Sequence, residues 1–135
     1  MSTNLEIHSL GMKTGTTLKI KGKVDSDAAR FNVNLGNNSN DLALHFNPRF
    51  DDSRDGYVIV CNSKSGGSWQ SEQREKQLPF SQGSTVKFSI EFKDDKFVIK
   101  MPEGVEMEFP NRHNYNHIDY MAVNGGFKVT SFKLD

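Results

Sequence analysis

Three polar side chains with the chemistry to hold a polyhydroxylated ligand alternate along one short segment. His45, Asn47 and Arg49 are separated by Phe46 and Pro48. Alternate residues of a β-strand point to the same side, and positions two apart lie roughly 6.5 to 7 Å from each other. That spacing matches hydroxyl groups on a single hexose ring. The segment therefore predicts a strand with one polar face that is suited to hydrogen bonding with a sugar.

The next segment repeats this arrangement. Val58, Val60 and Asn62 share one alternation phase, whereas Ile59 and Cys61 take the other. Asn62 is therefore predicted on the polar face, with Val60 as an accessory position, and Cys61 on the inner face. A buried small residue is the favoured interpretation of Cys61, since no base lies near it in the sequence to activate a nucleophile.

A third segment supplies an aromatic ring and two charges. Glu72 and Arg74 share an alternation phase, but Trp69 lies an odd number of residues from Glu72. This mismatch predicts a bend or bulge at 70–71 that tilts the indole away from the plane of its strand. Arg49 and Arg74 are expected to flank Glu72 in a charge-assisted network, and Asp55 is expected to extend this network.

These groups together fit a β-galactoside. Galactose has an apolar patch of C–H bonds on one face, for which Trp69 offers a flat wall. Its polar rim includes an axial 4-hydroxyl, for which His45, Asn47 and Arg49 offer donors and acceptors. Glucose has an equatorial 4-hydroxyl, which would leave these groups unpaired. Each unpaired buried polar group costs about 1 to 3 kcal/mol, enough to set specificity.

The elements that must position these residues are short strands. Apolar and polar residues alternate in runs that are separated by Gly, Asn, Asp and Ser, and helical periodicity is almost absent. We expect a single all-β domain over residues 1–135, a β-sandwich of two antiparallel sheets. The predicted inward-facing residues include Leu18, Ile20, Val24, Phe31, Val33, Leu35, Leu42, Leu44, Phe46, Val86, Phe88, Ile90 and Phe92.

Apolar residues near both ends of the chain fall on two alternation phases. Phe127 and Val129 take one phase and Phe132 and Leu134 the other. Near the N-terminus, the same applies to Leu5, Ile7 and Leu10. A terminal strand with apolar groups on both faces either lies inside the core or covers a partner subunit. The second alternative predicts a homodimer through the terminal strands, with Leu5, Ile7, Val129, Phe132 and Leu134 at its interface.

The bulk composition excludes several partners. Basic and acidic residues are equal at 17 each, so no surplus positive field predicts a nucleic acid or an anionic lipid as partner. No apolar run is long enough for membrane insertion, and residues 1–10 lack the features of a signal peptide. One cysteine cannot form an internal disulfide. We expect cytosolic synthesis.

The sequence resembles the galectins, and the resemblance covers almost the whole chain. It is closest to the prototype members, which have one domain and dimerise. Four stretches carry it: His45-Phe46-Asn47-Pro48-Arg49-Phe50, Val60-Cys61-Asn62, Trp69-Gln70-Ser71-Glu72-Gln73-Arg74, and Phe109-Pro110-Asn111-Arg112. Ser53 and Arg54 depart from a loop histidine that is common in the best-known prototype members, so the preference among substituted galactoses is left open.

The resemblance implies a jelly-roll fold with the sugar on the concave sheet. His45, Asn47 and Arg49 are expected to hold the galactose 4-hydroxyl, and Asn62 and Glu72 the 6-hydroxyl. Trp69 is expected to stack on the ring, while Glu72 and Arg74 reach the adjoining sugar. Arg30 is a candidate contact for extended glycans. The family likeness also implies no metal or other cofactor, cross-linking of glycoproteins and glycolipids by a bivalent homodimer, and export without a signal peptide.

The sequence is less consistent with three alternatives. An intracellular scaffold that acts through protein contacts would leave the polar motif residues without an obvious role. A glycosidase needs two opposed carboxyl groups, one with a raised pKa, whereas arginines flank Glu72. His113 and His117 have a spacing that can suit zinc, but no third ligand is evident, so a solvated loop is favoured.

Overall fold

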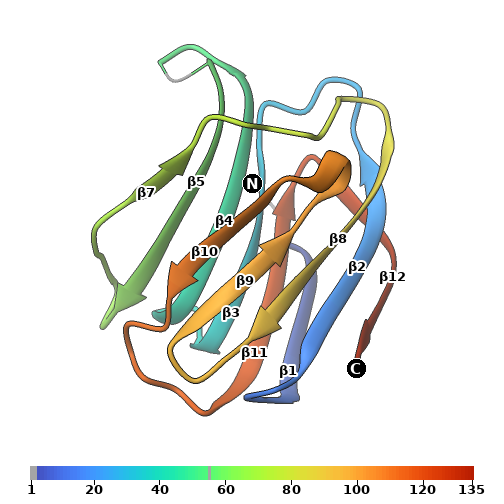
Figure 1. Cartoon of the computed structure of the whole chain (residues 1–135). Helices are drawn as coiled ribbons and strands as arrows, with labels where there is room; N and C mark the ends of the chain where they lie inside the picture. Colours follow the sequence, from blue (N-terminus) through green and yellow to red (C-terminus); the bar gives the residue numbers. More distant parts are fainter. Residues whose placement is uncertain (1–2, 55) are drawn as a thin grey trace.

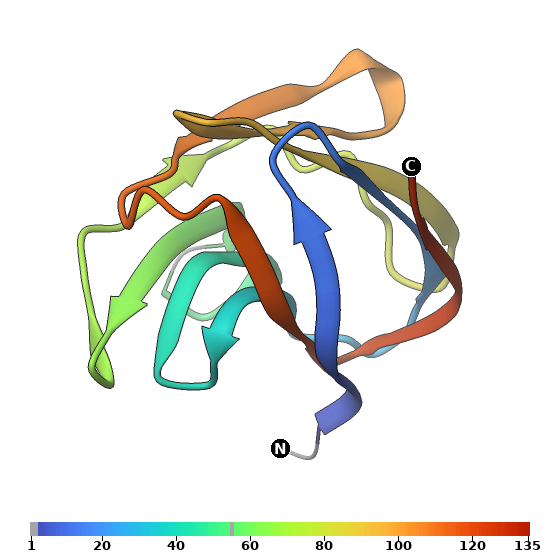
Figure 2. The same cartoon turned by 90° about the horizontal axis from the view of Figure 1, so that it is seen from below.

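The protein forms two antiparallel β-sheets that pack face to face (Figure 1). This computed structural model describes residues 3–54 and 56–135. The two layers are seen separately in the view along the sandwich in Figure 2. The all-β sandwich that the alternation predicts is therefore confirmed, whereas its extent as one domain stays a prediction. Among the described residues, no helix is long and apolar enough to cross a membrane.

The larger sheet has seven strands and carries the candidate sugar site. Its order is β1 (Thr3–Lys13), β11 (His117–Gly125), β3 (Phe31–Asn38), β4 (Asp41–Asp52), β5 (Gly56–Ser65) and β6 (Ser68–Trp69), and β7 (Gln73–Glu75) also pairs with β5. The separation of β6 from β7 confirms the predicted break at 70–71. Both short strands pair with β5, so they place Trp69 and Arg74 against the same neighbour.

The smaller sheet has five strands and closes the other side of the core. Its order is β10 (Glu106–Pro110), β9 (Lys96–Lys100), β8 (Thr85–Phe92), β2 (Thr17–Val24) and β12 (Phe127–Leu134), and the short 3₁₀ turn η1 (Pro102–Gly104) links β9 to β10. Burial alternates residue by residue along β2, as the sequence predicts for a strand with one face in the core.

Phenylalanine fills much of the space between the sheets. Nine of the ten phenylalanines are buried, which explains their frequency in the sequence. Phe31 of β3 stacks on Phe127 of β12 with 4.5 Å between ring centroids, and Phe46 of β4 lies 5.4 Å from Phe88 of β8. Such ring pairs join strands of opposite sheets and stabilise the sandwich by about 0.5 to 1.5 kcal/mol each beyond simple burial.

One predicted inward residue faces the other way. Leu42 was expected in the core beside Leu44, but it packs in a separate small cluster with Tyr120 and Ala122, while Ala43 joins the main core. The pairing of β4 with its neighbours shifts register between positions 42 and 45. The irregularity inverts the phase before Leu44, so the prediction for Leu42 is wrong.

Register shifts also bring the apolar residues of the two terminal strands onto a single face. In β12 a register shift between Val129 and Ser131 brings Phe132 opposite Ile20 and Leu134 opposite Leu18. Val129 and Leu134 then pack against the core, whereas Phe132 remains 38% exposed. In β1 a similar shift lets Leu5, Ile7 and Leu10 all pack against the core. The expectation of two apolar faces on these strands is therefore wrong.

Candidate functional site

The outer face of β4 carries the three alternating polar residues. In the antiparallel register, His45 lies opposite Asn62 of β5, and Asn47 lies opposite Val60. Phe46 points into the core between them, as predicted. The strand therefore holds its polar side chains in a fixed row along the sheet, which preorganises them for a rigid ligand.

Asn47 is fixed by two hydrogen bonds. Its side chain is nearly inaccessible, with 2% of its surface exposed. The Asn47 Nδ2 atom donates to the Phe31 carbonyl at 2.7 Å, and Arg49 Nε donates to Asn47 Oδ1 at 3.0 Å. The amide therefore holds the guanidinium of Arg49 in place, and the N–H groups at the far end of the fork are oriented along the outer face.

His45 is held as a neutral ring. Its Nδ1 lies 2.6 Å from Asn34 Oδ1, a carbonyl oxygen that can only accept, so Nδ1 carries the proton and Nε2 is an acceptor. Burial, together with the positive charges of Arg49, Lys64 and Arg30, lowers the pKa of His45 to about 4. At neutral pH the site thus combines an acceptor at His45 with a donor at Arg49, a pair that matches a hydroxyl group.

Asn62 is supported from the neighbouring loops. Its Nδ2 donates to the Gln70 carbonyl at 3.0 Å, and its Oδ1 accepts from the Ser63 amide at 2.7 Å. Arg112 Nη1 approaches the same oxygen at 3.4 Å and lies over the ring of Phe109. The sequence analysis assigned no role to the stretch 109–112. In the structure, this stretch supports the side chain of Asn62 through Arg112.

Trp69 stands beside the polar row. Half of its surface is exposed, and its ring centroid lies 4.5 Å from that of His45 at a tilt of 53°. Lys64, its partner in the β5–β6 register, places Nζ 4.8 Å from the indole centroid. An exposed indole that is held by two neighbours presents a rigid apolar wall next to hydrogen-bonding groups.

Glu72 and Arg74 complete the site at the β7 end. Arg74 donates to Glu72 Oε1 from Nε at 3.2 Å and from Nη2 at 2.8 Å, and Arg74 lies opposite Val60 in the register. The predicted pairing of these two charges is therefore confirmed. Arg30 forms an isolated backbone bridge with Arg49, which places it at the other end of the row. Asp55 lies outside the described residues.

Several supporting residues were missed by the sequence analysis. Asn34 sets the tautomer of His45, and Lys64 contacts the indole. Both have a signal in the alternation: Asn34 lies between the core residues Val33 and Leu35, and Lys64 shares the phase of Asn62. The contact of Gln70 with Asn62 had no such signal, because the backbone carbonyl of Gln70 makes it.

His113 and His117 do not form a metal centre. His113 Nε2 lies 3.0 Å from the carbonyl oxygens of Leu42 and Lys64, and His117 Nδ1 lies 2.8 Å from Asp119 Oδ2. Across residues 3–54 and 56–135, no group of three His, Cys, Asp or Glu side chains is arranged to hold a metal ion. Cys61 is fully buried, as predicted, and burial raises the pKa of its thiol.

The fold and site define a galactoside-binding lectin. The sequence profile of the family described as "Galactoside-binding lectin" matches residues 3–134, and the chain belongs to this family. The resemblance to the galectins is thus confirmed. Lectins of this family bind sugars without converting them, so the prediction that the chain is not an enzyme is confirmed as well.

Solved structures of galectins superpose on almost the whole chain. Chicken galectin 2 is 54% identical with a TM-score of 0.94, and the match covers 99% of this chain and 100% of that one. A homodimeric agglutinin from chicken liver, CG-16, is 46% identical with a TM-score of 0.92 over 97% and 98% of the two chains. Toad ovary galectin, solved in complex with thio-digalactose, is 36% identical with a TM-score of 0.94 over 100% of both chains.

Proposed function

We propose that this chain binds β-galactosides of the lactose and N-acetyllactosamine type on glycoproteins and glycolipids, without a metal ion. The observation that carries the proposal is the fixed row of His45, Asn47 and Arg49 beside the half-exposed indole of Trp69. The complex of toad ovary galectin with thio-digalactose, a digalactoside, supports the same ligand class for this chain.

The chemistry of the row explains a preference for an axial 4-hydroxyl. Such a hydroxyl donates a hydrogen bond to Nε2 of His45 and accepts one from the guanidinium of Arg49. The apolar face of galactose then rests on Trp69. Asn62 is placed to donate to the 6-hydroxyl from the second N–H of its amide, since its carbonyl oxygen already accepts from Ser63. Glu72 and Arg74 reach the adjoining sugar.

A glycan array read with and without a chelator tests this proposal. We expect binding to terminal β-galactosides and to N-acetyllactosamine, and no binding to glucosides that differ at the 4-hydroxyl. Because one unpaired buried group costs about 1 to 3 kcal/mol, the preference should be at least about fivefold. Addition of the chelator should change neither the binding to galactosides nor this preference. Binding that is restricted to glycans without galactose, or that is lost with the chelator, would contradict the proposal.

We also propose that two copies pair through their terminal strands. β1 and β12 are edge strands of the two sheets and lie on the same side of the sandwich, where Asn4 Nδ2 donates to the carbonyls of Gly125 at 2.6 Å and Phe127 at 3.0 Å. Both strands therefore offer one continuous free edge, with Phe132 exposed upon it. The homodimeric state of the chicken agglutinin supports this assignment.

Sedimentation at micromolar concentration tests the dimer. We expect a dimer for the wild type and a monomer for Phe132→Glu, because the charge would be buried without a partner at the interface. The monomer should still bind lactose but should no longer agglutinate glycoprotein-coated beads. Tyr57→Glu is the matched control, since Tyr57 is another exposed aromatic residue and lies away from this edge. A wild-type monomer, or a dimeric Phe132→Glu variant, would place the interface elsewhere.

For its cellular location, we propose synthesis in the cytosol followed by export that does not use a signal peptide. The free and fully buried thiol of Cys61 is compatible with both compartments, because burial protects it from oxidation outside the cell.

A further inference from the structure

The outer face of the five-stranded sheet collects most of the lysines of the chain. Seven of its twelve lysines are exposed there, although the chain as a whole carries equal numbers of basic and acidic residues. We call this set the lysine face: Lys19, Lys21, Lys23, Lys87, Lys100, Lys128 and Lys133. The total charge therefore hides a strong local charge, and the rest of the molecule is net acidic.

The strand register sets like charges against each other. Lys23 lies directly opposite Lys128 of β12, and Lys21 lies directly opposite Lys87 of β8. Like charges that face each other across a strand pair destabilise a sheet. No salt bridge within the described residues involves these four side chains. A bound anion would relieve this repulsion, so the face is suited to binding an anion.

One carboxylate neutralises only the margin of the face. Asp135 Oδ2 lies 2.8 Å from Lys19 Nζ, and Asp135 Oδ1 lies 3.6 Å from Lys133 Nζ. The other acidic side chains of this sheet are Glu91, one residue before the end of β8, and Glu106 and Glu108 on β10, the strand farthest from β12. The centre of the lysine face therefore stays positive.

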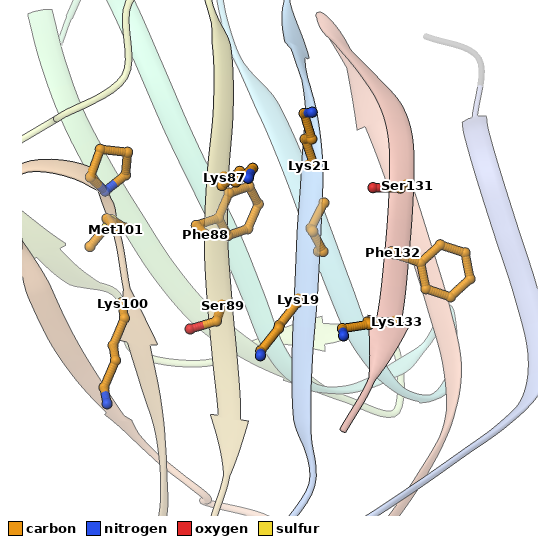
Figure 3. Close-up of a pocket in the computed structure, with 12 residues that line it drawn as sticks. Lys19, Lys21, Lys87, Phe88, Ser89, Lys100, Met101, Ser131, Phe132 and Lys133 are labelled. Carbon is orange, nitrogen blue, oxygen red and sulfur yellow. The ribbon is translucent and has the colours of Figure 1, made fainter.

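A shallow groove runs across the lysine face. It has a volume of about 630 Å³, and Figure 3 shows the lysines of β2, β8, β9 and β12 around it. Met101 and Pro102 lie at its β9 end, and Ser89 and Ser131 add hydroxyl groups between the charges. The groove crosses four strands, so a ligand in it meets a cation on each strand in turn, with neighbouring strands about 4.8 Å apart.

We propose that the lysine face binds a linear acidic polysaccharide that carries sulfate or carboxylate groups on successive sugar rings. The cations are all lysines, which act as flexible point charges and not as the planar forks of arginine. They therefore suit charges distributed along a chain better than a single phosphate held in one geometry. The serine hydroxyl groups are available to the sugar hydroxyls between the charges.

An anionic bilayer fits this face less well. A peripheral membrane protein usually adds apolar side chains that enter the lipid to its electrostatic attraction. Among the described residues, the large exposed hydrophobic side chains are Tyr57, Trp69 and Phe132. Of these, Phe132 alone borders the groove, and it lies at the edge strand β12.

The two binding sites lie on opposite sheets. The galactoside row is on the outer face of β4 and β5, and the lysine face is on the outer side of the other layer. An acidic polysaccharide should therefore bind without competing with lactose. This independence separates the proposal from the galactoside site, since either one can fail without the other.

Binding of the protein to immobilised heparin at low ionic strength tests this proposal. The variant Lys21→Glu/Lys87→Glu reverses a facing pair and keeps it like-charged, so the folded state should change little. We expect its affinity for heparin to fall at least about tenfold, and wild-type affinity to fall steeply with added salt. The matched control Lys13→Glu/Lys93→Glu makes the same charge change at exposed lysines away from the face and should lose less than about twofold.

Competition with lactose and binding to anionic vesicles complete the experiment. Saturating lactose should leave heparin binding unchanged, and both double variants should bind lactose as the wild type does. The proposal is overturned if lactose displaces heparin or if the control variant loses as much affinity as the facing pair. Binding to phosphatidylserine vesicles without binding to heparin would also overturn it, since the ligand would then be a lipid surface.

Discussion

Replacement of Arg49 by alanine should abolish retention of the protein on immobilised lactose. In the proposed complex the guanidinium donates charge-assisted hydrogen bonds to the sugar, and each is worth about 1.5 to 3 kcal/mol. The same change removes the donor to Asn47 Oδ1, an oxygen in a side chain that is 2% exposed. The affinity for lactose should therefore fall at least about 100-fold. Arg49→Lys keeps the charge but loses the fork, so it should also bind weakly.

Trp69→Ala should give the same loss of retention through a different contact. It removes the apolar wall and the ring that packs on His45, without removing a hydrogen bond to the sugar. Tyr57→Ala is the matched control, because Tyr57 is an aromatic residue of similar exposure outside the site and should leave lactose binding unchanged. Thermal unfolding of each variant checks the fold. If folded Arg49→Ala or Trp69→Ala is retained normally, the sugar binds elsewhere.

Regular alternation made much of the fold predictable from the sequence. Along β8, which pairs with β2 without interruption, burial follows the two-residue period. The same rule placed Asn62 outward and Cys61 inward on β5. The site residues of β4 and β5 could be predicted because they lie on such an uninterrupted stretch, where phase alone decides which face a side chain takes.

Register shifts are the features that alternation cannot supply. Leu42 and Phe132 were assigned to the wrong faces, since each is separated from its neighbours by an extra residue in the pairing. A bulge depends on the partner strand, and one sequence carries no information about which residue opposes which. The break before Glu72 could be predicted only because the candidate site residues Trp69 and Glu72 fell on conflicting alternation phases.

Supporting contacts from distant segments could not be predicted from the sequence either. Arg112 reaches Ser63 and Asn62 from about fifty positions along the chain, donating to Ser63 Oγ at 3.0 Å. Nothing in local spacing predicts such a contact. The neutral state of His45 also required the structure, because burial and three cations from separate segments combine to lower its pKa. The binding groups were readable from the sequence, whereas their electrostatic state was not.

That electrostatic state predicts how lactose binding depends on pH. His45 accepts a hydrogen bond only while Nε2 is unprotonated, and its pKa is lowered to about 4. Affinity should therefore stay level from pH 8 to about 5 and fall as the pH drops through about 4, where protonation turns the acceptor into a donor. A histidine with an ordinary pKa would lose binding near pH 6.5. Titration calorimetry at several pH values measures this profile.

Asn34→Asp gives this prediction a sharper form. The new carboxylate would lie where Asn34 Oδ1 now stands, 2.6 Å from Nδ1 of His45. An opposite charge at that distance raises a histidine pKa by about 1 to 3 units, so the loss of lactose binding should move up to about pH 5 to 7. Far-UV circular dichroism at each pH separates protonation from acid unfolding. If the folded variant keeps the wild-type profile, the acceptor for the galactose 4-hydroxyl is a group other than His45.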